Sequence, residues 1–241
     1  AWVMLPIMDG FAKYLSYELP VLQITWARYF FTVLFTFPLM FFFFKKYLVW
    51  TDKPKLQLIR GLILLTANIS FFYSISVISL PKALTLAFVA PLVVTAFSPF
   101  FLGESVGYRR WAAVIIGFIG SLVVIRPGFL EINLASLAAL GTGIMYGFYL
   151  IITRKLSTSD NPLLTLLLTG VVGAIIATIF MPFVWVSPTF NQWSIMTAIG
   201  LFACIGHLFI ILSLKFADAS KLAPFSYFEI VTNIIIAYYF F

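Results

Sequence analysis

The sequence predicts an all-α membrane protein, a bundle of about nine transmembrane helices that form two inverted repeats. Three observations carry this prediction: an apolar composition, a series of membrane-length apolar segments, and a similarity between the two halves of the chain. Hydrophobic residues make up 63% of the chain and charged residues only 10%. A soluble domain has about 25% charged residues, so most of the outer surface must face lipid.

Several other classes of protein are disfavoured by the same composition. A net charge of +7 can indicate nucleic-acid binding, but the basic residues here flank apolar runs, and no nucleic-acid partner is expected. Cys204 and His207 are the single cysteine and histidine of the chain, so neither a disulfide framework nor a metal cluster is expected. No Walker A loop and no H-E-x-x-H motif is present. We therefore expect no catalytic residue, no metal and no cofactor.

Nine apolar segments are expected to form the helices, with short polar connections between them. Asp9 lies within the first segment, which also lacks a basic leader and a cleavage site, so a signal peptide is not indicated. The segments are Ala1–Leu15, Val21–Phe44, Leu56–Ser79, Ala83–Leu102, Trp111–Ile125, Leu134–Thr153, Leu163–Val184, Ile195–Leu214 and Ser220–Phe241.

Positive charge predicts the orientation, because cytoplasmic loops carry an excess of Lys and Arg. If the first segment runs outward, the loops after the second, fourth, sixth and eighth segments are cytoplasmic. These loops hold Lys45, Lys46, Lys53, Lys55, Arg60, Arg109, Arg110, Arg154, Lys155, Lys215 and Lys221. Lys13, Lys82 and Arg126 remain on the outer side. We expect a multi-pass protein of the plasma (inner) membrane with a cytoplasmic N-terminus.

An internal repeat is indicated when the chain is compared with itself. A common offset places Gly61 on Gly200, Lys82 on Lys221 and the aromatic Phe88 on Tyr227. The first repeat is expected over residues 1–125 and the second over residues 132–241. An odd number of helices in each repeat inverts the second copy, an arrangement that many secondary transporters use to alternate between two open states.

The fourth segment carries the most distinctive motifs of the sequence. Lys82-Ala83-Leu84-Thr85-Leu86-Ala87 leads into Ala90-Pro91, and the helix ends at Phe101-Leu102-Gly103-Glu104. Arg126-Pro127-Gly128 follows the next helix. These motifs resemble the drug/metabolite transporter superfamily, and specifically its EamA-type permeases. Arg28 also matches an arginine common in the second helix of that family. The resemblance spans the whole chain and implies an EamA-like bundle with a small organic cargo.

The family has ten helices, and its ninth ends in a second Gly-Glu. This chain stops at Ala237-Tyr238-Tyr239-Phe240-Phe241, before that point. The expectation is therefore a fragment that lacks the tenth helix. The cargoes that the resemblance implies are amino acids, other metabolites and toxic organic compounds, but the motifs do not select among them.

Glu229 is the strongest candidate for contact with a substrate or a proton, because an ionisable group in hydrocarbon is costly and should face a cavity. Ser226, Glu229 and Asn233 would share one helix face at spacings of three and four residues. Pro224 should free a backbone carbonyl near this face. The alternative is that Glu229 pairs with a cation and only holds the bundle together.

Asp9, Arg28 and Lys82 are further charged candidates, each with a structural alternative. Asp9 could pair with Lys13 at i+4, Arg28 could neutralise Asp9, and Lys82 could anchor a helix at the interface. Aromatic and polar residues on the helices that line the cavity in the resembled family complete the candidate site. They are Tyr146, Tyr149, Asn68, Tyr73, Trp26, Phe88 and Tyr227. His207 is expected to act as a hydrogen bonder between helices.

The leading hypothesis is a secondary transporter, with a small-molecule substrate such as an amino acid or another metabolite bound between the repeats. Proton coupling through Glu229 or Asp9 is one source of energy for it. The alternatives are a channel, a membrane scaffold, or an intramembrane lipid-modifying enzyme, for which the sequence offers no cluster of acidic and histidine residues. Small residues at Ala113, Gly117 and Ser121 indicate close helix packing or a homodimer face. Membrane lipid is the remaining expected partner.

Overall fold

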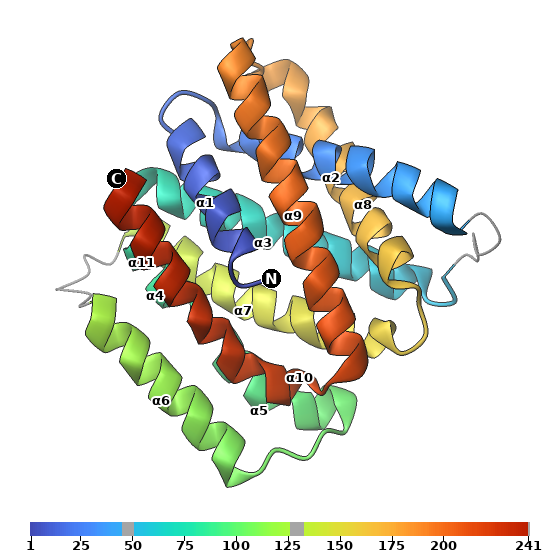
Figure 1. Cartoon of the computed structure of the whole chain (residues 1–241), viewed down its shortest axis with the longest axis vertical. Coiled ribbons are helices and arrows are strands. Elements are labelled where there is room, and N and C mark those ends of the chain that lie inside the picture. Colours follow the sequence, from blue (N-terminus) through green and yellow to red (C-terminus); the bar gives the residue numbers. More distant parts are fainter. Residues whose placement is uncertain (45–50, 126–132, 241) are drawn as a thin grey trace.

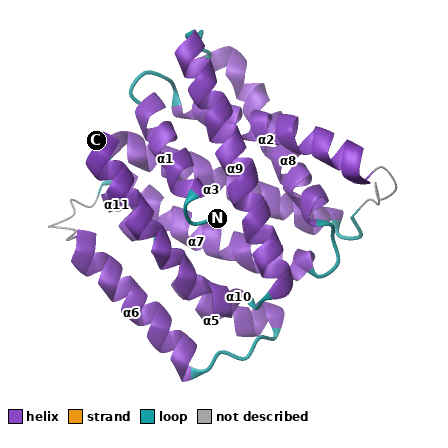
Figure 2. Cartoon of the chain, viewed as in Figure 1, coloured by secondary structure: helices purple, strands orange, loops and turns teal. Residues whose placement is uncertain are grey.

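The computed structural model describes residues 1–44, 51–125 and 133–240. Within these residues the chain folds into helices and contains no strand (Figure 2). The all-α fold expected from composition is therefore confirmed. Lys45, Lys46 and Arg126, which entered the orientation argument, lie outside the described residues.

The helices follow the order of the predicted apolar segments. They are α1 (Met4–Leu15), α2 (Val21–Phe44), α3 (Pro54–Val77), α4 (Leu80–Ala87), α5 (Ala90–Leu102), α6 (Tyr108–Ile125), α7 (Leu134–Ser157), α8 (Pro162–Val184), α9 (Phe190–Phe216), α10 (Ala219–Leu222), a 3₁₀ segment (Ala223–Phe228) and α11 (Glu229–Phe240). Six spans in the described chain are long and apolar enough to cross a membrane: α2, α3, α4 with α5, α7, α8 and α9. The protein is thus a multi-pass membrane protein.

Local sequence signals explain several helix ends. Pro54 and Pro162 stand in the first turn of α3 and α8, where a missing N–H costs nothing. At the start of α9, Thr189 and Gln192 form a capping box, in which each side chain bonds the other residue's backbone N–H. Gly103 ends α5 in a left-handed conformation, with φ of 68°, which glycine adopts without strain.

Two of the predicted transmembrane segments are interrupted. The fourth breaks at Phe88 and Val89, just before Pro91, and gives α4 and α5. The ninth begins with α10, continues as the 3₁₀ segment that contains Pro224, and becomes α11 only at Glu229. The regular helix face expected for Ser226, Glu229 and Asn233 is therefore wrong, because Ser226 lies in the 3₁₀ segment. Discontinuous helices of this kind mark the binding sites of many transporters.

The core forms where helices distant in the sequence cross closely. α2 packs against α8 and α9, α3 packs against α7, and α1 packs against α9, while α6 lies at the edge of the bundle (Figure 1). Glycines allow these close crossings: a Cβ atom on Gly200 would lie 2.2 Å from Cβ of Phe31, and one on Gly173 2.3 Å from the ring of Tyr29. A Cβ atom on Gly117 would meet the Tyr227 ring at 2.3 Å, so Gly117 packs inside the protomer.

Two basic residues lie elsewhere than the sequence predicted. Arg60 belongs to α3 and is fully buried, whereas it was expected in a cytoplasmic loop. Its guanidinium donates hydrogen bonds to the Thr153 hydroxyl at 3.1 Å and to the Thr165 carbonyl oxygen at 2.5 Å, and also to the Thr169 hydroxyl. Polar groups of α7 and α8 therefore compensate its burial.

Lys13 does not pair with Asp9, as the i+4 spacing had suggested. Its ammonium group instead donates to the carbonyl oxygens of Ile75 at 2.5 Å and Ile78 at 3.5 Å, and lies 4.8 Å from the Tyr17 ring centre. The last carbonyls of a helix lack intrahelical partners and attract a cation. The end of α3 thus takes Lys13, and the Asp9 carboxyl is left without this partner.

Candidate functional site

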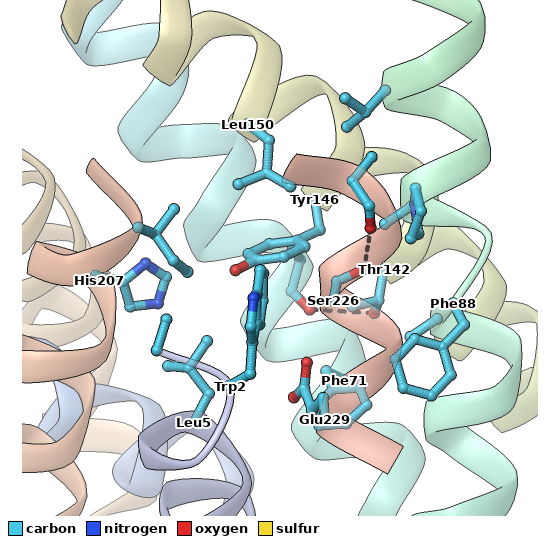
Figure 3. Close-up of a pocket in the computed structure, with 18 of the residues that line it drawn as sticks. Trp2, Leu5, Phe71, Phe88, Thr142, Tyr146, Leu150, His207, Ser226 and Glu229 are labelled. Atoms are coloured by element: carbon cyan, nitrogen blue, oxygen red, sulfur yellow. Dashed lines mark hydrogen bonds between the residues drawn. The ribbon is translucent and has the colours of Figure 1, made fainter. Parts of the chain in front are cut away.

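A cavity of about 140 Å³ lies where the two interrupted segments meet α1, α3, α7 and α9. Its wall is mostly apolar, with a few polar groups at fixed positions, which is typical of small-molecule sites. Aromatic rings make up much of the wall: Trp2, Phe71, Phe88 and Tyr146 (Figure 3).

Two carboxyl groups from opposite ends of the chain line this cavity. Asp9 comes from α1 and is 5% exposed, and Glu229 is the first residue of α11 and is 9% exposed. Neither carboxyl forms an ion pair or a hydrogen bond with any residue in the described ranges. Figure 3 shows Glu229 beside Phe71, and both line the cavity. Buried acids that lack a hydrogen bond and an ion pair are suited to bind a cation or a proton.

A chain of hydrogen bonds between α2, α9 and α7 forms the opposite polar wall. Arg28 Nη2 lies 2.6 Å from Nε2 of His207, and the Tyr149 hydroxyl lies 3.0 Å from Nδ1 of the same ring. A guanidinium can only donate, so Nε2 accepts and Nδ1 carries the proton toward Tyr149. Arg28 also bonds the Met8 sulfur at 3.4 Å and covers the Tyr29 ring. His207 is thus an inter-helix hydrogen bonder, as expected.

Tyr146 presents a free hydroxyl group at the cavity. The hydroxyl is buried and has no hydrogen-bond partner among the described residues, and the Tyr146 ring stacks on Tyr149 at 5.5 Å between centres. In Figure 3 the Tyr146 hydroxyl points toward the side of the cavity that holds His207. An unsatisfied buried donor costs about 1–3 kcal/mol. A ligand that hydrogen-bonds this hydroxyl would recover that free energy.

The breaks in both segments are held against each other. Phe88, at the α4–α5 break, lines the cavity, and the Tyr227 ring lies 5.5 Å behind it. The Tyr227 hydroxyl donates to the Phe88 carbonyl oxygen at 3.4 Å, and Ser226 donates to the carbonyl oxygen of Ala223 at 2.7 Å. Irregular backbone is tolerated at membrane depth where it borders a cavity. These two hydrogen bonds supply donors to two backbone carbonyl oxygens of the irregular segments.

About half of the candidates from the sequence meet in this cavity. Those that line it are Asp9, Arg28, Asn68, Phe88, Tyr146, Ser226 and Glu229. Tyr149 and Tyr227 stand directly behind lining residues. Asn68 bonds the Tyr29 hydroxyl at 2.7 Å, which orients the amide.

Four candidates lie outside the cavity. Lys82 is exposed and Tyr73 is half-buried. Trp26 packs with Phe30, Trp185 and Trp193, and its indole donates to Thr178. Asn233 is buried and donates to the backbone carbonyl of Glu229 at 3.1 Å, so it supports the start of α11.

The sequence did not single out several lining residues, among them Trp2, Met8 and Phe71. These are ordinary apolar residues in apolar helices, and the same residue types also cover the lipid-facing surface. Phe100 and Phe183, for example, are 83% and 82% exposed. Hydropathy alone cannot separate a lipid-facing side chain from a cavity-facing one.

Comparison with known proteins agrees with the all-α membrane fold. The chain belongs to the EamA-like transporter family, which matches residues 4–126 and 133–241. This membership places the protein among transporters of small molecules, and not among enzymes.

The relatives include proteins with different cargoes. S-adenosylmethionine uptake transporters of Rickettsia bellii and Rickettsia prowazekii are 25% and 26% identical, covering 97% and 98% of this chain and 80% of each relative. A riboflavin transporter of Vibrio cholerae is 29% identical over 64% of this chain and 52% of its own length. A crystal structure superposes with a TM-score of 0.74 at 18% identity, covering 97% of this chain and 85% of that one, which supports the fold alone.

Proposed function

We propose that the protein is a secondary transporter for a small organic solute that carries both a positively charged group and a carboxylate. The observation that carries this proposal is the position of Asp9 and Glu229. Both carboxyls border one cavity, and neither forms a hydrogen bond or an ion pair within the described residues, while Arg28 borders the cavity from another helix. A cationic group would bind the acids and a carboxylate would bind the guanidinium.

S-adenosylmethionine is the first cargo to test. It combines a sulfonium cation, an amino-acid group and an adenine ring. The acids and Arg28 suit its charges, and Phe88 and Tyr146 offer ring faces for the adenine. Relatives named for its uptake also cover nearly the whole chain. Riboflavin is the second candidate, because the aromatic wall would also suit an uncharged ring system.

The test is thermal stabilisation of the purified protein by a panel of cargoes. The panel contains S-adenosylmethionine, riboflavin, amino acids, nucleotides and organic cations. A ligand that binds the folded state raises its melting temperature by mass action. A shift with S-adenosylmethionine that is lost in Glu229→Gln and Tyr146→Ala supports the proposal. A shift with riboflavin alone, undiminished in Glu229→Gln, contradicts the cationic substrate.

Alternating access would use the two interrupted segments. We propose that residues 1–125 and 132–241 act as inverted repeats, and that the α4–α5 break and the 3₁₀ segment bend as the cavity changes sides. Proton coupling through Glu229 or Asp9 is part of the proposal. If Glu229→Gln in liposomes still shows full pH-driven uptake, Glu229 is not the residue that couples transport to protons. Sustained single-channel conductance would instead favour a channel.

The orientation and the assembly state belong to the same proposal. The described basic residues Lys53, Lys55, Arg109, Arg154 and Lys155 lie in or next to the connections α2–α3, α5–α6 and α7–α8. We propose that these connections face the cytoplasm, with the N-terminus on the same side. Labelling of Lys155→Cys from one side of bacterial inner-membrane vesicles tests this orientation. A homodimer remains a prediction, and the mass of the detergent-solubilised protein tests it.

A further inference from the structure

Glu104 holds the beginning of the second interrupted segment, although 115 residues separate it from its first partner there. One carboxylate oxygen accepts the backbone N–H of Ala219 at 2.8 Å. The other accepts both the backbone N–H and the hydroxyl of Ser220, at 3.0 and 2.6 Å. The Glu104 side chain is only 7% exposed. Hydrogen bonds from a carboxylate to backbone N–H groups are charge-assisted and strong.

Ion pairs extend this contact to α6 and α7. Arg154 of α7 lies 3.7 Å from Glu104 and 3.4 Å from Asp218, and it donates to the Leu214 carbonyl oxygen at 2.6 Å. Arg110 of α6 lies 3.6 Å from Asp218 and donates to the Ser220 hydroxyl at 2.7 Å. We call Glu104, Arg110, Arg154, Asp218 and Ser220 the Glu104 cluster. It joins four elements at the end of the bundle where α5 meets α6.

α10 stands between the Glu104 cluster and the cavity. Its first residue, Ala219, is bound by Glu104 and also lines the cavity. Leu222 and Ala223 line the cavity one turn further on. α10 packs against α5, α7 and α9 (Figure 1). Moving α10 away from α5 would therefore open the cavity wall toward this end, and such a movement must break the bonds to Glu104.

We propose that Glu104 is a positioning residue whose cluster closes the cavity at the α5–α6 end, and that release of this cluster is the step that opens the cavity there. The proposal rests on the proposed transport function, because it assigns a role in changing the side of access. The Glu104 carboxylate does not border the cavity, so it acts through α10 and not by touching the solute.

Sided labelling of a cysteine in the cavity tests the proposal without any substrate. Cys204, the single cysteine, is replaced by alanine, and Ser226→Cys places a near-isosteric thiol in the cavity wall. A membrane-impermeant thiol reagent is applied to one side or the other of liposomes with a known orientation. The labelling rate is compared before and after Glu104→Gln, which loses the negative charge and replaces one of the two acceptor oxygens by an NH2 donor.

The matched control is Asp160→Asn. Asp160 is also a buried acid near the same end, where its carboxylate accepts from Thr51 at 2.6 Å and Gln57 at 2.7 Å, but it does not border the cavity or touch α10. Asp218→Asn removes a second member of the cluster, one that makes no side-chain bond to an α10 backbone N–H.

The expected result is a labelling rate from the α5–α6 end that rises about fivefold or more in Glu104→Gln, the size of a typical coupling between two states. Asp218→Asn should give a smaller rise on the same side, and Asp160→Asn should give none. If Glu104→Gln does not fold, the comparison of Asp218→Asn with Asp160→Asn decides.

Two results would overturn the proposal. One is an unchanged rate in both cluster variants. The other is an equal rise from both sides, which would indicate general loosening of the bundle. If cargo binding depends on Glu229 but the labelling rate does not change, closure by the Glu104 cluster is contradicted and the proposed transport function still stands. If the labelling rate rises from one side only but no cargo binds, closure by the Glu104 cluster is supported and the proposed transport function is contradicted.

Discussion

The Arg28 guanidinium on α2 lies 2.6 Å from Nε2 of His207 on α9, although 179 residues separate them in the chain. This contact directs a buried cation at the cavity that also holds Asp9 and Glu229. Because His207 accepts from Arg28, its other nitrogen donates to Tyr149 and connects a third helix. The polar side chains on this wall of the cavity are thus held in place by hydrogen bonds between residues that lie far apart in the sequence.

Replacement of His207 should weaken cargo binding through Arg28. His207→Leu removes the acceptor and leaves a buried donor unsatisfied, at a cost of about 1–3 kcal/mol. His207→Gln keeps an acceptor and should lose less. Isothermal titration with the cargo found in the thermal screen measures the affinity, and the melting temperature reports stability. Equal affinity in His207→Leu and the unmodified protein would show that Arg28 needs no support from His207.

Loss of either cavity acid should weaken the binding of a cationic cargo. Hydrogen bonds to charged groups contribute about 1.5–3 kcal/mol, so Glu229→Gln and Asp9→Asn should each raise Kd about tenfold or more. Glu18→Gln is the control, because Glu18 is exposed and its carboxylate accepts a hydrogen bond from the Gln192 side chain at 2.6 Å, away from the cavity. A larger loss in Glu18→Gln than in Glu229→Gln would contradict the assigned cation site.

Arg60 should stabilise the fold without touching the cargo. Arg60→Lys cannot reproduce the fork that bonds Thr153, Thr165 and Thr169, and we expect a loss of about 1–3 kcal/mol of unfolding free energy. Arg60 does not line the large cavity, so Kd should stay the same. Lys55→Met, at an exposed site one turn earlier on α3, should lower the melting temperature far less.

Helix crossings at glycine should be sensitive to a single methyl group. In Gly173→Ala the new Cβ atom would lie 2.3 Å from the Tyr29 ring, and in Gly200→Ala 2.2 Å from Phe31. Overpacking of this kind costs about 1–3 kcal/mol. Gly120→Ala is the matched control on α6, where an added Cβ atom would have no described side chain or neighbouring helix within 4 Å, and it should be neutral or stabilising by up to about 1 kcal/mol. Melting temperatures of the three variants measure the difference.

The sequence by itself determined the class of fold and the order of the helices. Hydropathy is a local property, because each helix must satisfy its own backbone and present apolar side chains to lipid. The helix α2 begins at Val21, where its apolar run begins. Prolines favour irregular helix backbone at positions 91, 99 and 224. The helices are interrupted beside Pro91 and at Pro224, whereas α5 continues through Pro99.

Only the tertiary structure decided which polar groups meet. Lys13 donates hydrogen bonds to the carbonyl oxygens at the end of α3 and does not pair with its neighbour Asp9. Arg60 lies inside the bundle, where hydroxyl groups of α7 and α8 accept its hydrogen bonds. The Glu104 carboxylate accepts a hydrogen bond from α10, although more than a hundred residues separate them in the chain. Such choices depend on helix crossings that bring remote segments within hydrogen-bond reach, and no local pattern in the sequence records which partner a buried charge will find.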